Sequence, residues 1–445
     1  MSARRKVVLL TYYFPPAGAA GSLRMLAFTR HLPEFGWDPV VVTVGQMGVV
    51  FEDETLLARL DPAVRIHRWF MPLAGSWALR KKTAVKDPPS SSRSTPATVK
   101  ARKPRLRSHV RHFIETMVAL PDPAVGWSIA SGIRAGNWMK AQGVSVFVTT
   151  SPPYSTLLAG FIARAISGAA WVSDLRDPWA TFQADPTGTL RDFVGRTLQS
   201  QTIRHADKVL ANTPRFREAL LSQPGAAPDR IDTLPNGYDA EEIARARANA
   251  AGRTSNGTFT IVHAGGLYKG LRQPVEVLEA MARAMKAPGV TRNIRLVLPG
   301  DSAYHHDADL KRRIVALGLE GRVEFPGYVP HEEVLALEAS ADLLLLIQGG
   351  AFRIQVPSKA YEYLAIGRPI LAVTTEGATA DVINSSPVGD VVAPGDIEGL
   401  TASLVRRLRE TPGPGFTDPP PGVYSRRELT AKLAEVLDAA SFSRG

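Results

Sequence analysis

A lysine and a glutamate lie three residues apart within VPSKAYEYLAIGRPILAVT, residues 356–374. Pro357 and Ser358 suit the start of a helix, and the apolar residues that follow recur at helical spacing. Lys359 would lie in the first helical turn, where the helix dipole already favours an anion. A cation at this position suits a bound phosphate, and Glu362, on the same helix face, is left to bind hydroxyl groups.

The predicted helix lies between two apolar runs, residues 341–347 and 370–373, which have the composition of buried strands. Strand, helix and strand form one unit of a parallel sheet, because parallel strands need a crossover connection. In open sheets of this kind, ligands bind beyond the carboxyl ends of the strands. The sequence therefore predicts a phosphate site at that edge of the sheet, with Ser358 and Lys359 beside it.

Two further loops have glycines and basic residues before a predicted helix. FPPAGAAG, residues 14–21, follows the first predicted strand; Gly18 and Gly21 permit close approach of the backbone, and Arg24 follows in the first helical turn. The loop lacks the G-x-G-x-x-G fingerprint of dinucleotide binding. It predicts a site for an anion or a polar ligand, and the alternative is a tight turn without a ligand.

The second loop follows the predicted strand FTIVHAGG, residues 259–266. Gly266, Lys269 and Arg272 precede a helix that begins near Pro274. Backbone N–H groups and two cations at a helix start again suit a phosphate.

The segment SDLRDPW, residues 173–179, places three charged residues at the end of a predicted strand. Asp174 and Asp177 are candidates to anchor substrate hydroxyls or to orient Arg176. The alternative is an internal Asp–Arg pair that braces the loop.

The chain of 445 residues is 44% hydrophobic and 21% charged, which is typical of a globular protein. It has no cysteine, which excludes disulfides and thiolate metal sites and fits a reducing compartment. The basic, apolar start is interpreted as a first strand and not as a signal peptide, because it runs into aromatic residues and prolines. No apolar run approaches the ~18 residues needed to span a bilayer.

The net charge of +11 is concentrated in residues 80–112, which hold eleven Lys or Arg and one Asp. Residues 80–108 are rich in Pro and Ser and are predicted to be a disordered insertion. With the aromatic, helical stretch at 110–139 they suit an anionic membrane surface, and the alternative is a solvated linker before an ordinary packed helix. An aromatic-studded basic groove is missing, so nucleic acid is not an expected partner.

Predicted strands and helices alternate in two series, separated by a polar stretch at residues 240–257. This order predicts an α/β fold of two Rossmann-like domains with parallel sheets, residues 1–238 and 239–422, and a C-terminal helix at 423–445 that returns to the first domain. The sequence HHDAD at 305–309 is interpreted as a helix cap and not as a metal site, because no second group of ligands completes it.

The ordered set of motifs resembles the GT-B-type glycosyltransferases of the large retaining family called family four. The motifs that carry the resemblance extend over nearly the whole chain outside the basic tract: FPPAGAAGSLRMLAFTRHLPEFGW, TSPPYS, SDLRDPW, ADKVLANT, LPNGYD, HAGGLYKGLRQP and VPSKAYEYLAIGRPILAV. The resemblance implies two facing domains. The second would bind a nucleoside-diphosphate sugar, and the first would hold the acceptor.

The resemblance also implies roles for individual residues of the donor site. Glu362 resembles the glutamate that contacts the nucleotide ribose. Lys359, with Lys269 or Arg272, resembles the cations on the diphosphate. Gly18 and Gly21 resemble the glycine loop that faces the donor phosphates, and the expected donor site is completed by Arg24, Gly266 and Ser358.

The chain departs from the family pattern at two points. The family has two glutamates eight positions apart, and Ile354 stands at the position of the first. The family's histidine near the acceptor is not evident either. Asp174, Arg176 and Asp177 occupy that neighbourhood and are, with Lys359, the catalytic candidates.

The expected activity is transfer of a sugar from a nucleoside-diphosphate sugar to a glycan or lipid-linked acceptor, with retention and without a metal or other cofactor. The expected context is cell-surface polysaccharide or glycolipid synthesis by a cytoplasmic protein, peripheral on the inner face of the membrane through residues 80–112. The alternatives are a sugar-nucleotide epimerase with the same fold and a non-catalytic scaffold that binds nucleotide sugar or membrane.

Overall fold

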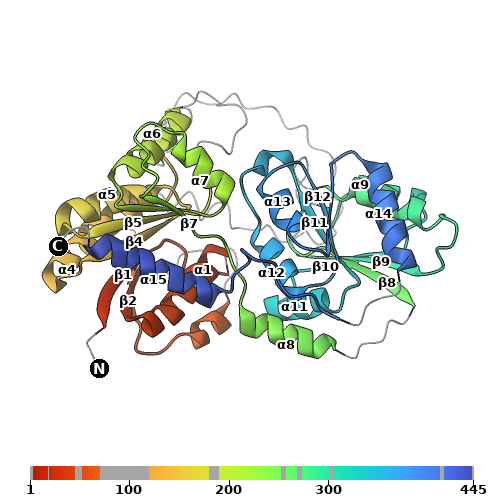
Figure 1. Ribbon diagram of the computed structural model, residues 1–445, viewed down its shortest axis with the longest axis horizontal. Helices are drawn as coiled ribbons and strands as arrows, with labels where there is room; N and C mark the ends of the chain where they lie inside the picture. Colours follow the sequence, from red (N-terminus) through yellow and green to blue (C-terminus); the bar gives the residue numbers. More distant parts are fainter. Residues whose placement is uncertain are drawn as a thin grey trace, which may run out of the picture. The chain divides into compact units, whose positions relative to one another are not determined.

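The computed structural model shows two compact units, labelled by element in Figure 1. The first comprises Met1–Ala211, Leu220–Asp232 and Thr430–Gly445, and the second comprises Asn212–Ala219 and Thr233–Leu429. The described residues are 4–18, 20–45, 53–70, 120–179, 190–251, 257–267, 273–300, 304–410 and 415–442. The basic tract at 80–112 and the predicted phosphate ligands Lys269 and Arg272 lie outside them.

The sheet of the first unit has the strand order β3-β2-β1-β4-β5-β6-β7 within the described residues. Its strands are β1 (Arg5–Leu10), β2 (Trp37–Val44), β3 (Arg65–Trp69), β4 (Val146–Ser151), β5 (Ala170–Leu175), β6 (Lys208–Ala211) and β7 (Ile231–Thr233). Neighbours from β3 to β6 pair in parallel. The central strands are buried along nearly their whole length, as expected of a parallel sheet covered on both faces.

Helices connect these strands, as the alternating pattern predicts. They are α1 (Ala20–His31), α4 (Val125–Gln142), α5 (Ser155–Ser167), α6 (Leu190–His205) and α7 (Pro214–Leu221), with 3-10 turns at Leu32–Phe35 and Glu54–Arg59. α4 packs closely on α5. A Cβ added to Gly132 of α4 would lie only 2.9 Å from the carbonyl oxygen of Ala159 on α5, so glycine permits this approach. The helical stretch predicted at 110–139 is confirmed from Val125 onward, and residues 110–119 lie outside the described residues.

The sheet of the second unit has the order β10-β9-β8-β11-β12-β13, and its neighbouring strands pair in parallel. Its strands are β8 (Thr258–Val262), β9 (Asn293–Pro299), β10 (Val323–Gly327), β11 (Leu343–Gln348), β12 (Ile370–Thr374) and β13 (Gly389–Val392). Its helices are α8 (Ala240–Ala250), α9 (Val275–Ala284), α10 (Ala308–Ala316), α11 (His331–Ala339), α12 (Ser358–Ile366), α13 (Ala378–Asn384) and α14 (Ile397–Arg409), with a 3-10 turn at Gly350–Phe352.

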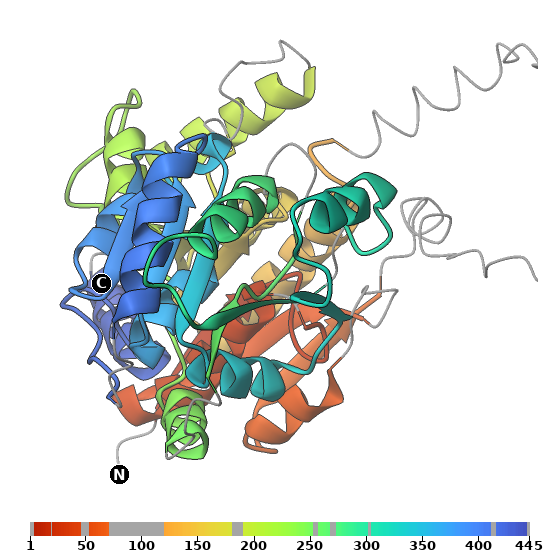
Figure 2. The same ribbon diagram turned by 90° about the vertical axis from the view of Figure 1, so that its right-hand side faces the viewer.

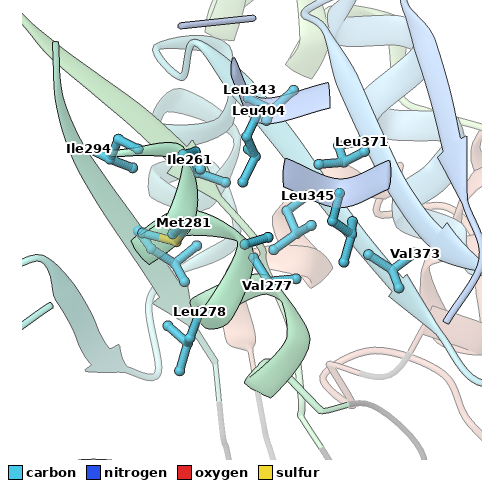
Figure 3. Close-up of a cluster of buried hydrophobic side chains, with 14 of the residues drawn as sticks. Ile261, Val277, Leu278, Met281, Ile294, Leu343, Leu345, Leu371, Val373 and Leu404 are labelled. Carbon is cyan, nitrogen blue, oxygen red and sulfur yellow. The ribbon is translucent and has the colours of Figure 1, made fainter. Parts of the chain in front are cut away.

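Alternate residues of the second sheet enter two separate apolar clusters. Leu343 and Leu345 of β11 pack with α9 and α14, where Met281 and Leu404 lie (Figure 3). Leu344 packs on the opposite face with residues of α8, α11 and α12. The same layering of helices around the sheet can be followed in Figures 1 and 2. The predicted pair of Rossmann-like, parallel-sheet units is therefore confirmed.

The C-terminal helix α15 (Arg426–Phe442) belongs to the first unit from Thr430 onward. There Asp438 forms an ion pair with Arg5 of β1. The predicted return of this helix to the first domain is confirmed. Among the described residues, every helix is too short or too polar to cross a membrane.

The strand orders define one position in each sheet where ligands are expected. In the first sheet the order reverses between β1 and β4, and in the second it reverses between β8 and β11. At such a reversal the two adjacent crossovers leave in opposite directions and open a crevice beyond the carboxyl ends of the strands.

Candidate functional site

Helix α12 follows β11 and begins close to the point where the second sheet reverses its order. Pro357 is its N-cap residue, Ser358 is its first residue, and Gly367 ends it in the left-handed conformation with φ of 73°. These are the start and stop that the sequence predicts. The helix therefore presents its N-terminal N–H groups and Lys359 near the carboxyl edge of the sheet.

Lys359 contacts the end of β8. Its Nζ donates a hydrogen bond of 2.6 Å to the carbonyl oxygen of Ala264 and lies 3.3 Å from Nε2 of His263. His263 is fully buried, and its Nδ1 lies 2.8 Å from the carbonyl oxygen of Leu345 on β11. Because a carbonyl oxygen only accepts, Nδ1 carries the proton, and in the neutral ring Nε2 is an acceptor that faces the ammonium group. Lys359 is thus held at the β8–β11 crevice.

Glycines let the backbone come close to this ammonium group. Gly265 has a φ of +105°, and a Cβ there would lie 3.3 Å from Nζ of Lys359. Gly300, at the end of β9, has a φ of +125°, and its Cβ would lie 2.9 Å from the carbonyl carbon of Gly265. Larger residues would be strained or would clash at both positions. Gly266 follows directly in the same loop, as predicted.

Glu362 lies one turn further along α12, with its side chain 12% exposed. Its Oε1 is 3.5 Å from Nη2 of Arg426, the first residue of α15. The hydroxyl of the next residue, Tyr363, accepts a hydrogen bond of 3.1 Å from the N–H of Ala264. Burial, and then the nearby Glu338 and Glu362, raise the pKa of Tyr363 well above its ordinary value. Helix α12 is therefore fixed to the end of β8 by two residues, Lys359 and Tyr363.

Sequence reasoning missed a buried carboxyl group beside this site. Glu338 of α11 is 1% exposed, and its Oε2 has no hydrogen-bond partner among the described residues. Burial raises its pKa well above the ordinary value, Glu362 raises it further, and Lys359 lowers it. The sequence holds a signal for this group, because Glu338 is the single charged residue in the otherwise apolar run VLALEA, residues 334–339.

A cavity of about 330 Å³ opens beside the starts of α9 and α10. Its polar lining includes Gln273, Asp307 and Arg313. Asp307 caps α10 by accepting a hydrogen bond of 2.8 Å from the N–H of Leu310, so the capping role predicted for it is confirmed. Groups of three or more His, Asp or Glu that could hold a metal ion are not found among the described residues.

In the first unit, Arg24 and Asp174 form a buried ion pair. Nε and Nη2 of Arg24 donate to the two carboxylate oxygens at 3.0 and 2.8 Å, and Thr150 donates to one of them at 3.0 Å. The side chains are 6% and 1% exposed. The internal Asp–Arg pair, the alternative interpretation of this segment, is thus what the structure shows for Asp174, with Arg24 instead of the neighbouring Arg176 as the partner.

Arg176 lies beside the first turn of α1. Its Nη2 donates a hydrogen bond of 2.6 Å to the carbonyl oxygen of Pro152, and a Cβ on Gly21 would lie 2.1 Å from its Nη1. Burial lowers the pKa of Arg176, and Asp177 and Asp174 oppose that shift. The close approach expected of a ligand at Gly21 is therefore made by an arginine of the protein itself.

The structure thus brings part of the predicted site together in each unit. Ser358, Lys359, Glu362 and Gly266 lie at or beside the carboxyl edge of the second sheet. Arg24, Gly21, Asp174 and Arg176 cluster in the first unit; Gly18 is exposed in the loop before α1, and the backbone oxygen of Asp177 accepts a hydrogen bond from Tyr154. The catalytic and donor-binding roles of all these residues stay predictions.

Two family models match the chain in succession. The model described as glycosyl transferase 4-like domain matches residues 18–237, and the model described as glycosyl transferases group 1 matches residues 258–410. Glycosyltransferase family models thus match most of the chain between them, each over less than half of it. The two matches correspond to the two series of strands and helices.

The curated proteins that this chain resembles are distant from it in sequence. A 2-deoxystreptamine glucosyltransferase of Streptomyces kanamyceticus is 24% identical over 58% of this chain and 66% of that protein. D-inositol 3-phosphate glycosyltransferase 1 of Catenulispora acidiphila is 25% identical over 48% of this chain and 51% of that protein. The chain thus spans about half to two-thirds of these relatives.

The fold has a counterpart among solved structures. The Anabaena protein HepE, crystallised with UDP and glucose, superposes with a TM-score of 0.55 over 99% of this chain and 95% of its own, at 17% identity. This similarity establishes the GT-B fold.

Proposed function

We propose that the protein transfers a sugar from a nucleoside-diphosphate sugar to a hydroxyl of a glycan or lipid-linked acceptor, with retention of the anomeric configuration. The observation that carries the proposal is the arrangement at the β8–β11 crevice. There a lysine at a helix N-terminus is fixed beside a glycine loop, and a glutamate follows on the same helix. The matches to two glycosyltransferase family models support the reaction type.

The arrangement suits the charge that develops during such a transfer. When the bond between the anomeric carbon and the phosphate oxygen breaks, negative charge grows on the leaving diphosphate. The ammonium of Lys359 and the N-terminus of α12 stabilise that charge from positions fixed before the reaction, which is usually the largest contribution to catalysis. The acceptor oxygen forms the new bond to the anomeric carbon, and its proton passes to the departing phosphate. This scheme requires no metal ion.

Glu362 supplies the group that recognises the nucleoside. A carboxylate accepts hydrogen bonds from two neighbouring hydroxyls, and ribose presents such a pair at its 2′ and 3′ positions. Because HepE was crystallised with UDP, uridine is the first base to test. The inositol 3-phosphate and 2-deoxystreptamine named for the relatives are the first acceptors to test beside lipid-linked glycans.

The test is a transfer assay with a panel of nucleotide sugars and these acceptors. Lys359→Ala and Glu362→Ala should each lower product formation by about tenfold or more. The first variant loses the cation that stabilises the leaving diphosphate, and the second loses the carboxylate that binds the ribose hydroxyls. Lys311→Ala, on the exposed face of α10, is the matched control. A coupled NMR spectrum of the product reports its anomeric configuration.

Three results would contradict the proposal. Unchanged transfer by both variants would show that Lys359 and Glu362 take no part in the reaction. Conversion of the donor without acceptor would indicate an epimerase, and binding without turnover across the panel would indicate a scaffold.

We also propose that residues 80–112 hold the protein to an anionic membrane, where lipid-linked acceptors for surface glycan synthesis would lie. The support is the sequence, which concentrates ten of the eleven net positive charges in that tract. Deleting residues 81–107 should abolish sedimentation with anionic vesicles, and unchanged sedimentation would refute this part.

A further inference from the structure

An arginine lies at the start of helix α15, where the helix dipole does not favour a positive charge. Arg426 is the first residue of α15, and its positive charge lies at the positive end of that helix. The helix start itself is stabilised by other residues. The N–H and the hydroxyl of Ser425 donate to Oε2 of Glu428 at 2.7 and 2.8 Å, and the N–H of Glu428 donates to the Ser425 hydroxyl at 3.2 Å. This is a capping box, so helix formation gives no reason for the arginine.

The backbone fixes Arg426 in place. Its N–H donates to the carbonyl oxygen of Tyr238 at 2.8 Å, and Tyr238 forms a parallel bridge with Ser425. Gly237 permits this crossing, because a Cβ there would lie 2.6 Å from the carbonyl oxygen of Tyr424. The position of the arginine is therefore set by backbone contacts between residues 237–238 and residues 424–426.

The side chain of Arg426 is directed at Glu362. Nη2 lies 3.5 Å from Oε1, and the two side chains are only 11% and 12% exposed. A pair so nearly excluded from water is screened little by salt. It also holds one oxygen of the carboxylate in a defined place, while the second oxygen keeps its capacity to accept hydrogen bonds.

Other charged groups surround this pair. From α11, Nε2 of His331 lies 3.4 Å from Oε2 of Glu242 on α8. Burial lowers the pKa of His331, but Glu242 and Glu362 outweigh it and the net direction is upward. Among the described residues, Glu338 of α11 and Tyr363 of α12 also interact electrostatically with Glu362, and Lys359 of α12 interacts with Glu338. Arg426 is the member of this set within hydrogen-bond range of the Glu362 carboxylate.

We propose that Arg426 is a positioning residue that orients the Glu362 carboxylate toward the nucleotide's ribose, and so makes the donor site prefer ribonucleotides to 2′-deoxyribonucleotides. The inference rests on the proposed function, because it needs Glu362 to bind the ribose. A carboxylate that is free to rotate accepts the 2′-hydroxyl less well, whereas contacts to the diphosphate do not depend on Arg426. Arg426 therefore acts on discrimination more than on overall binding.

The experiment is calorimetric titration of the full chain with UDP, GDP and ADP and with their 2′-deoxy counterparts. The wild type should bind one ribonucleotide roughly tenfold to a hundredfold more tightly than its deoxy form, the range for a hydrogen bond to a charged group. Arg426→Gln should weaken ribonucleotide binding and leave deoxynucleotide binding nearly unchanged, so the ratio falls toward one. Arg426→Lys should restore part of the ratio, and Arg427→Gln, at the exposed neighbouring position, should keep it.

A double-mutant cycle separates positioning from a merely structural role. In a Glu362→Gln background, Arg426→Gln should have no further effect on the ratio, because the carboxylate it orients is gone. Equal weakening of both nucleotide forms by Arg426→Gln, with an unchanged ratio, would overturn the inference and leave the proposed function intact. Failure of the wild type to bind any of the nucleoside diphosphates would overturn the proposed function, and the inference with it.

Discussion

The buried carboxyl group of Glu338 gives a prediction whose size follows from the structure. Glu338 is 1% exposed, and burial and Glu362 hold its pKa well above the ordinary value of 4.5. In the unfolded chain the same group ionises near that ordinary value. Between the two pKa values the folded state binds one proton more than the unfolded state, so stability falls as pH rises.

Between the two pKa values, the slope of unfolding free energy against pH is set by the binding of one proton. The wild type should lose about 1.4 kcal/mol of unfolding free energy per pH unit relative to Glu338→Gln, which has no proton to bind. The loss starts near pH 5 and stops at the pH where the folded carboxyl ionises. Gln keeps the shape of the neutral acid, so the two proteins should be of similar stability at the acidic end. Glu333→Gln, on the exposed side of the same helix, is the matched control.

The assay is urea denaturation at several pH values from 5 to 8. All seven tryptophans lie between Trp37 and Trp179, in the first unit, so their fluorescence follows that unit. Circular dichroism follows both units, and the transition that fluorescence does not report belongs to the second. If the difference between wild type and Glu338→Gln stays constant over this pH range, Glu338 is ionised in the folded protein and the reasoning is refuted.

Two further predictions concern the first unit. Asp174→Asn should destabilise it by about 3–5 kcal/mol, because the buried guanidinium of Arg24 loses its counter-charge; a change below 1 kcal/mol in the tryptophan-detected transition would contradict this. Gly21→Ala should displace Arg176, since the new methyl group would overlap its guanidinium, at a cost of about 1–3 kcal/mol. Combining Gly21→Ala with Arg176→Ala should recover most of that loss, and additive losses would show that the two residues do not compete for space.

The part of the site on α12 could be predicted because its signals are local. Helix start, helix stop and the anomalous lysine all lie within a few residues of one another, and capping and periodicity act over that range. The strands of both sheets were predictable for the same reason, since buried parallel strands are continuous apolar runs.

The partners of the predicted residues were not predictable. Asp174 pairs with Arg24, 150 positions away, and not with Arg176 two positions along the chain. Glu362 meets Arg426 across 64 positions, and Lys359 meets His263 across 96. A charged residue in an apolar run, or at the helix end where the dipole disfavours its charge, indicates that it has a partner. Parallel crossovers bring distant segments together, and the sequence does not show which distant segment supplies that partner. Tertiary contacts decide the pairing.

The central claim is that a nucleoside diphosphate binds at the β8–β11 crevice of the second unit. Hydrogen–deuterium exchange of the full chain, with and without the best-binding nucleoside diphosphate, tests this claim by showing which peptides the ligand protects. The account predicts slower exchange in peptides from residues 257–267 and 356–366, and loss of that protection in Lys359→Ala. Protection confined to the cavity beside α10, or to the first unit, would contradict it.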